Sequence, residues 1–393
     1  MFANAVVFVD TMFFTALTPL LPHFADHLGL GKAGAGVLAA AYPAGVLVGG
    51  IPSGMVAARA GVKRTVLIGL TFVAICTVLF GVATTSWELD TARFIQGAAS
   101  SFSWTGALAW LVAATPASKR ATTIGGAFAS ATGGALFGPV LGAIASLAGI
   151  RWTFIAVGIG SLALAAWASS IPKERPETPQ PLSALMRAFS DNRVRAGFWF
   201  VSLPGLLFGT LTVLAPLRLS HLGFGAVAIG ATFLIAAGGE VMNNLAVGRA
   251  ADRHGAVRPL WFGLAGSAIV AAVLPWPGSR FSLAVVVVLA CLAFATMYTP
   301  ATTMLSDASE HVGLDYGYTF AIVNIAWAIA QTTGAAGSGA LARATSDTVP
   351  YLVLSVTCAL TLAALWRLRD SISLTTRLAP VSSDSSAVIT DTD

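Results

Sequence analysis

GMVAARAGVKR, at Gly54–Arg64, and GRAADRHGAVR, at Gly248–Arg258, are two versions of one short cationic turn. They lie 194 positions apart, and only the second copy carries an acid, Asp252, where the first has Ala58. The same shift aligns further residues upstream of each turn, and nine identities at one offset indicate an internal duplication. The aligned residues are Leu28, Gly29, Gly31, Gly36, Gly54, Ala57, Arg59, Gly61 and Arg64 with Leu222, Gly223, Gly225, Gly230, Gly248, Ala251, Arg253, Gly255 and Arg258.

The composition indicates that both copies belong to a membrane protein. The 393 residues are 56% hydrophobic and 10% charged, whereas soluble domains carry about 25% charged residues. Because a soluble protein this apolar would expose large apolar patches, lipid is the expected solvent. Cys76, Cys291 and Cys358 each stand alone in an apolar run, a pattern that favours neither a disulfide framework nor a metal cluster.

Twelve apolar runs are each long enough to cross a hydrocarbon layer of about 30 Å. They predict an all-α membrane protein with six helices in each half. The first run carries Asp10 in its middle and lacks a basic leader region, so we interpret it as a spanning helix rather than a signal peptide. The predicted spans are 2–22, 34–57, 64–85, 89–112, 122–147, 151–171, 197–219, 226–248, 258–276, 281–305, 316–341 and 349–368.

The positive charges predict the orientation, because cytoplasmic loops are enriched in Lys and Arg. With the N-terminus inside, sixteen of the 22 Lys and Arg residues fall in inner loops or the tail, five fall in outer loops, and Arg93 lies within a span. Both termini are therefore predicted to be cytoplasmic. We expect an N-terminal six-helix bundle over 1–171, a cytoplasmic linker over 172–196, a C-terminal six-helix bundle over 197–370 and a disordered cytoplasmic tail over 371–393.

Several motifs resemble those of the major facilitator superfamily. The repeated turn is similar to the loop signature G-x-x-x-D-R-x-G-x-[RK]-[RK], from which the first copy departs at Ala58. RFIQG at Arg93–Gly97 resembles a signature of proton-coupled members, and Gly126–Ala143 is similar to the glycine-rich signature of the twelve-helix drug–proton antiporter branch. The resemblance implies two pseudo-symmetric bundles with a substrate path between them, near the middle of the membrane.

Three ionisable residues within the spans are the predicted sites of proton coupling or substrate binding: Asp10, Arg93 and Glu240. A charge in mid-helix costs roughly 2.5–3.5 kcal/mol on insertion scales, so such groups usually face a cavity or a partner. A structural hydrogen bond is the alternative for Asp10, and an interfacial position reached by a long side chain is the alternative for Arg93. Glu240 aligns with Val46, which favours a role outside the duplicated scaffold.

Further polar residues form stripes at helical spacing, some of them sharing a face with Arg93 or Glu240. We predict that they line the cavity, and helix–helix hydrogen bonding is the alternative. Although His23 and His27 have the spacing of helical metal ligands, no further ligand lies nearby, and no metal site is predicted. The predicted cavity-lining residues are Gln96, Ser100, Asn243, Asn244, Asn324, Trp327 and Gln331.

The fifth span carries small residues at spacings of four, which predict a groove that receives a neighbouring helix. The residues of this packing face are Gly134, Gly138, Pro139 and Gly142. In the antiporter branch this pattern is associated with export, and a generic packing face is the alternative.

The two cationic turns are predicted to form a cytoplasmic gate that closes when the cavity opens outward. The resemblance implies that each turn abuts a loop of the other half, and the charges of these loops differ: the loop before 316–341 is acidic and the loop before 122–147 carries Lys119 and Arg120. The alternative is that the turns only set the topology. The predicted gate residues are Gly54, Arg59, Gly61, Lys63, Arg64, Gly248, Asp252, Arg253, Gly255, Arg258, Glu310 and Asp315.

These features predict a secondary transporter rather than an enzyme. The sequence has no G-x-x-x-x-G-K-[ST] loop, so we expect no ATP engine and no cofactor, with a proton gradient as the energy source. We expect proton-coupled efflux of a small hydrophobic or amphipathic organic compound or drug, by a monomer in the cell membrane (plasma or inner) that binds no nucleic acid. Two alternatives stay open: a proton-coupled importer of a metabolite, and a non-transporting membrane receptor or scaffold.

Overall fold

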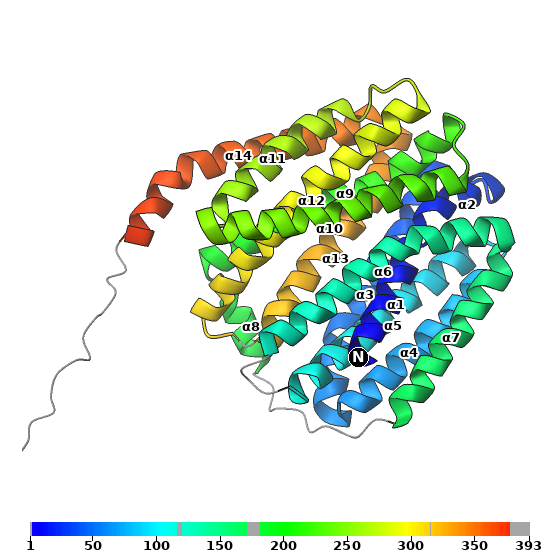
Figure 1. The fold of residues 1–393 in the computed structure, drawn as a ribbon, viewed down its shortest axis with the longest axis horizontal. Helices are drawn as coiled ribbons and strands as arrows, with labels where there is room; N and C mark the ends of the chain where they lie inside the picture. The colour runs from blue at the N-terminus through cyan, green and yellow to red at the C-terminus, as the bar shows by residue number, and fades with distance from the viewer. Residues whose placement is uncertain (1, 116–119, 171–180, 315, 378–393) are drawn as a thin grey trace, which may run out of the picture.

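A computed structural model describes residues 2–115, 120–170, 181–314 and 316–377, and its elements are helices (Figure 1). The first half of the chain contains α1 (Phe2–Thr15), a 3₁₀ turn η1 (Thr18–Leu20), α2 (Leu21–His27), α3 (Gly31–Ala60), α4 (Val62–Val82), α5 (Ser86–Ala113), α6 (Arg120–Ala148) and α7 (Ile150–Ser170). A short α8 (Leu182–Ala188) precedes the second half, which contains α9 (Asn192–His221), α10 (Ala226–His254), α11 (Val257–Val273), α12 (Arg280–His311), α13 (Tyr316–Ala344) and α14 (Thr348–Arg377).

The helices form the predicted all-α membrane bundle. Within the described residues, nine helical segments are long and apolar enough to cross a membrane, the first being Phe2–His27 with α1, η1 and α2 taken together, and α11 is a shorter apolar helix. The helices α5 and α13 fall outside this set, and both carry polar stripes. The start of α1, α8 and the last turns of α14 lie on one side of the bundle and α2 lies on the opposite side (Figure 1).

Exposed tryptophans mark the two surfaces of the membrane, where indole rings are favoured. One belt comprises Trp87, Trp152 and Trp276, and the other comprises Trp167, Trp199 and Trp366. The first belt lies on the side of α2. From the charge distribution, we take this side as the outer one.

The duplicated turn has the same backbone conformation in both halves. Gly61 follows α3 with φ 88° and ψ 156°, and Gly255 follows α10 with φ 80° and ψ 157°. Only glycine adopts this region without strain. The shared glycines therefore break two long helices at equivalent points, which lets α4 and α11 turn back into the membrane.

The helices in the structure differ from the predicted spans at three places. The first segment is long and apolar enough to cross a membrane over Phe2–His27, but it is interrupted after Thr15, where α1 ends. Pro19 and Pro22 lack the amide hydrogens that would continue the helical bonding there. The linker contains α8, whose Leu185 packs against the main hydrophobic core. The last helix continues to Arg377, since no glycine or proline follows position 368 before that point. Residues 378–393 of the predicted tail lie outside the described residues.

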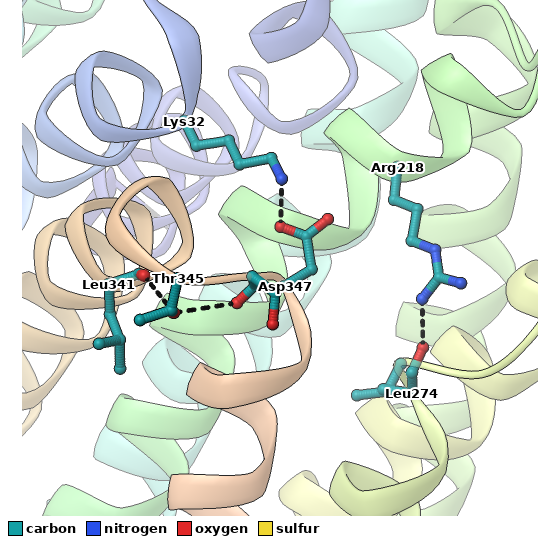
Figure 2. A network of polar contacts seen from close by, with 7 residues as sticks. Lys32, Arg218, Leu274, Leu341, Thr345 and Asp347 are labelled. Carbon is teal, nitrogen blue, oxygen red and sulfur yellow. Dashed lines mark hydrogen bonds and ion pairs between the residues drawn. The ribbon is translucent and has the colours of Figure 1, made fainter.

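The two halves meet closely at their outer ends. A Cβ built on Gly36 of α3 would lie 2.6 Å from the carbonyl oxygen of Ala335 on α13, so glycine is required for this approach. Next to this contact, Lys32 Nζ lies 2.6 Å from Asp347 Oδ1 (Figure 2). Among the side chains that the structure describes, this is the one ion pair, and it joins the two halves.

Candidate functional site

Asp10 lies in the first half, in a pocket of hydrogen-bond donors from α3 and α5. Its side chain is 3% exposed, and its Oδ2 accepts hydrogen bonds from Ser100 Oγ and from the Tyr42 hydroxyl, the latter at 3.2 Å. The Tyr42 hydroxyl also lies 2.8 Å from Ser100 Oγ. Ser103 is also part of this region of α5, and its hydroxyl donates to the Ser100 carbonyl at 2.9 Å. No Lys or Arg among the described side chains forms an ion pair with Asp10.

Arg93 holds the broken end of α1. Its Nη1 donates to the Phe13 carbonyl at 3.2 Å and its Nη2 donates to the Phe14 carbonyl at 3.1 Å. These carbonyls lie in the last turn of α1, where the break leaves acceptors without helical partners. A cation there also complements the negative end of the helix dipole. Since Arg93 is 3% exposed, the structure does not place it at the membrane surface.

Tyr42 joins the Asp10 and Arg93 networks. Its ring centroid lies 4.8 Å from Arg93 Cζ, a cation–π contact, while its hydroxyl contacts the Asp10 carboxylate. Gln96 extends the network, because its Oε1 accepts from Arg93 Nη1 at 2.9 Å and its Nε2 donates to Thr77 Oγ1 at 2.9 Å. The polar stripe of α5 is thus bonded inside the first half. The cavity-lining role of Gln96 and Ser100 stays a prediction.

The α10 stripe faces α12 within the second half. Glu240 is half-buried, and its carboxylate lies beside the Cys291 thiol of α12. Asn243 Nδ2 donates to the Leu292 carbonyl at 3.1 Å and to Thr296 Oγ1 at 2.9 Å. The structure therefore places Asp10 with Arg93 in one cluster and Glu240 with Asn243 in another, each in its own half.

The α13 stripe makes different contacts along its length. The Trp327 ring lies 5.4 Å from the Phe14 ring, which in turn lies 5.1 Å from the Tyr42 ring. Trp327 thus reaches from the second half to the aromatic side of the Asp10 cluster. Gln331 is buried with its Oε1 unpaired, as is Asn244 Oδ1 on α10. Asn324 is exposed.

A second aromatic contact joins the halves nearer the cytoplasm. The Phe128 ring on α6 lies 5.3 Å from the Phe320 ring on α13. On its other side, Phe128 lies 6.1 Å from the Trp104 ring. Two aromatic contacts thus join the halves, one between Phe14 and Trp327 and one between Phe128 and Phe320.

The small residues of α6 lie against α1. A Cβ on Gly134 would collide with the Phe8 carbonyl, and one on Gly142 would collide with the Ala16 carbonyl at the break. Gly138 faces Thr15 and the Met12 carbonyl in the same way. This groove holds α1 on both sides of its interruption. Pro139 is buried in the same helix, and its carbonyl faces Gly230 of α10.

The predicted gate residues lie at the cytoplasmic ends of the helices. Glu310 is exposed and forms no ion pair with Arg59 among the described side chains, so the closed gate stays a prediction. Lys63 Nζ donates to the Ser169 carbonyl at 2.5 Å within the first half. Arg59, Arg64, Arg253 and Arg258 are exposed, Gly54 and Gly248 face open space, and Gly61 and Gly255 are the helix ends described above. Lys119, Asp315 and the side chains of Arg120 and Asp252 lie outside the described residues.

The sequence profile of the Major Facilitator Superfamily matches residues 4–330 and again residues 244–382. The chain belongs to this superfamily. The major facilitator superfamily consists of transporters and not enzymes, and this chain is accordingly a multi-pass membrane protein. The overlapping matches agree with the duplication that the two turns indicate.

The relatives that align with this chain have low sequence identity to it. An MFS-type transporter of Yersinia pseudotuberculosis is 25% identical over 248 residues, which are 62% of this chain and 64% of that protein. The MFS-type transporter ppzB of Metarhizium majus is 32% identical over 94 residues, which are 24% of this chain and 21% of that protein. The chain therefore spans less than two thirds of the length of these relatives.

Solved structures share the fold of this superfamily member. The xylose transporter XylE from E. coli matches with a TM-score of 0.72 at 12% identity, covering 93% of this chain and 97% of that one. A POT family transporter matches with a TM-score of 0.75 at 13% identity, covering 94% and 96%. The nucleoside transporter NupG matches with a TM-score of 0.71 at 15% identity, covering 93% and 98%. At these identities the likeness concerns the fold alone.

Sequence reasoning missed two residues of the site in this transporter: Tyr42 and Thr77. Each belongs to an apolar or mixed stretch in which a single hydroxyl gives no periodic signal. Their partners come from other helices, so only the packing reveals them. The prolines at 19 and 22 are a signal that could have predicted the break in the first span.

Proposed function

We propose that this transporter exports a small hydrophobic or amphipathic organic compound in exchange for protons, by alternating access in the cell membrane. The observation that carries the proposal is the environment of Asp10: a buried carboxylate within the first candidate membrane span, held by uncharged donors and without an ion-pair partner among the described side chains. A carboxylate in such a place is costly, and taking up a proton removes that cost. Asp10 is therefore the proton carrier of the proposed cycle.

Arg93 has a positioning role in this proposal rather than a carrier role. Its guanidinium is bonded to the carbonyls that end α1, four and three positions after Asp10 along the chain. Guanidinium groups stay protonated in proteins. Arg93 would therefore fix the end of α1, and hence the position of Asp10, through each proton exchange.

The substrate class follows from aromatic side chains between the halves and from a carboxylate within the second half. Phe14, Tyr42 and Trp327 offer aromatic faces from both halves, and Glu240 offers a half-buried carboxylate in the second half. Aromatic faces together with a few polar groups favour flat, amphipathic molecules. Export rather than import is supported by the antiporter-like glycine face of α6 that packs on α1.

The direction and the coupling can be tested in membrane vesicles of known orientation. In inverted vesicles with an acid interior, an exchanger of this kind should accumulate ethidium, a flat amphipathic cation, and ethidium should release protons from the lumen. Asp10→Asn should abolish both signals. Asp26→Asn, a matched change at an exposed outer carboxylate, should leave both unchanged.

Import would give the opposite result. If ethidium, or a neutral aromatic probe such as chloramphenicol, enters right-side-out vesicles together with protons, the exchange direction proposed here is wrong. If Asp10→Asn transports and moves protons like the parent protein, the proton carrier lies elsewhere.

A further inference from the structure

Gln331 on α13 is a buried amide whose side-chain oxygen has no partner. The residue is 3% exposed, and its Oε1 forms no hydrogen bond with any group that the structure describes. Buried polar atoms of folded proteins are nearly always paired, and leaving a buried acceptor unpaired costs stability. An acceptor of this kind points to a ligand that donates a hydrogen bond to it.

Gln331 lies between two contacts that join the halves. Trp327 is one turn before it on the same face of α13 and packs on Phe14 of the first half, with ring centroids 5.4 Å apart. Ala335 is one turn after it, and the carbonyl of Ala335 closely approaches Gly36 of α3. The Gln331 side chain is therefore on the face of α13 that is turned toward the first half, just inside the close contact at the outer ends.

This face of α13 becomes more buried from its cytoplasmic end toward its outer end. Phe320 contacts Phe128 of α6, and Asn324, one turn farther along, is exposed. Because Phe320 and Trp327 on either side of Asn324 both contact the first half, solvent reaches Asn324 between the halves. Trp327 is half-buried and Gln331 is buried. The accessible space between the halves therefore ends at Gln331.

The groups at this closed end favour a particular ligand chemistry. Phe14, Tyr42 and Trp327 supply aromatic surface, which favours a flat aromatic molecule. The Gln331 oxygen is an acceptor and bonds only an N–H or O–H group. A site that hydrogen-bonds a donor of its ligand rejects an analogue without that donor, because the acceptor is then left unpaired. Gln331 thus discriminates among flat molecules by whether they carry a donor.

We propose that the Gln331 side-chain oxygen accepts a hydrogen bond from the substrate, and that the substrates are flat aromatic compounds with an amino group on the ring system. The ring lies against Trp327 and the amino group reaches Gln331. Because only a substrate with a donor pairs the buried acceptor, such a substrate stabilises the state in which the outer ends are closed. This inference rests on the proposed function for the aromatic, amphipathic substrate class.

Two permanently charged dyes differ in the hydrogen-bond donors that they carry. Proflavine methylated at the ring nitrogen has two amino groups, whereas acridine orange methylated at the ring nitrogen has dimethylamino groups in their place and no N–H. Binding of each dye to the purified protein can be measured by fluorescence anisotropy. We expect the parent to bind the amino dye about tenfold more tightly than the dimethylamino dye, the ratio that one hydrogen bond to a buried group provides.

Gln331→Met keeps the length of the side chain and removes the amide. We expect it to weaken binding of the amino dye about tenfold and to leave binding of the dimethylamino dye unchanged, so that the preference disappears. Gln331→Glu keeps an acceptor oxygen and should keep the preference. Thr333→Val is the matched control, because it removes an exposed hydroxyl of α13 that is bonded to the Ile329 carbonyl, and it should keep the parental preference.

The possible failures can be told apart. Equal binding of the two dyes by the parent, or binding of neither, would overturn the inference, and this measurement needs no variant. If Gln331→Met weakens binding of both dyes by the same factor, the side chain has a structural role only and the inference is wrong. If the dyes bind equally while ethidium is exchanged for protons in vesicles, the proposed function stands without the inference. If Gln331 controls the preference while the vesicles show import, recognition by Gln331 stands and the export direction is wrong.

Discussion

Removing the charge of Asp347 should shift this transporter toward its outward-open state. The ion pair with Lys32 joins the two halves at their outer ends, with Nζ and Oδ1 2.6 Å apart (Figure 2). The side chains are 35% and 28% exposed, so solvent screens the pair and its contribution is about 0.2–1 kcal/mol. At about 1.4 kcal/mol per tenfold change, Asp347→Asn should raise the ratio of outward-open to outward-closed molecules by about 1.4-fold to fivefold.

Distances between spin labels at the outer ends of the two halves measure this ratio directly. Thr85 and Gly278 suit the labels, because both are exposed and lie in outer loops of different halves. In Asp347→Asn the population of long distances should grow by the stated factor. Raising the ionic strength from about 0.01 M to 1 M shortens the Debye length from about 30 Å to 3 Å and should have the same effect on the parent.

Two results would refute this reasoning. Asp26→Asn removes an exposed outer carboxylate for which no ion pair is found among the described side chains, so it should leave the distances unchanged. If it shifts them as much as Asp347→Asn does, the effect is one of net charge and not of the ion pair. If Asp347→Asn leaves the distance distribution of the parent unchanged at low salt, the pair contributes nothing to closure.

Four further substitutions should lower the thermal unfolding temperature of the purified protein. Gly255→Ala and Gly61→Ala each put a Cβ on a backbone with φ near 80–88°, which should lower the free energy of unfolding by about 1–3 kcal/mol. Gly248→Ala is the matched control: its Cβ would meet nothing within 4 Å, so it should leave the unfolding temperature unchanged. Gly134→Ala forces a methyl group against the Phe8 carbonyl and should cost about 1–3 kcal/mol, whereas Gly126→Ala meets only Asn4 Nδ2 at 3.8 Å. Arg93→Lys keeps the positive charge, but an ammonium group cannot donate to the Phe13 and Phe14 carbonyls in the geometry of the guanidinium. We expect it to lower the free energy of unfolding by about 1–3 kcal/mol. An unfolding temperature equal to that of the parent would contradict the role of Arg93 in holding the end of α1.

The sequence by itself determined the medium, the number of crossings and the duplication. Apolar runs of about twenty residues can only be helices in lipid, because every backbone polar group must be bonded within its own segment there. The glycines at 61 and 255 could be recognised as equivalent, since a positive φ after a long helix requires glycine whatever surrounds it. These properties depend on local geometry and on the solvent, which a single sequence contains.

Only the tertiary structure decided which polar groups meet. Asp10 is bonded by Tyr42 and Ser100, which lie 32 and 90 positions away, and Arg93 is bonded by carbonyls that no side-chain pattern reveals. Such partners depend on the rotation and the depth of each helix relative to its neighbours. The sequence of a helix that is apolar on nearly every face determines neither its rotation nor its depth, because lipid and protein interior are similar solvents for apolar side chains. The rotation and the depth of each helix are fixed instead where glycines closely approach neighbouring backbones. These contacts exist only after the helices have packed together.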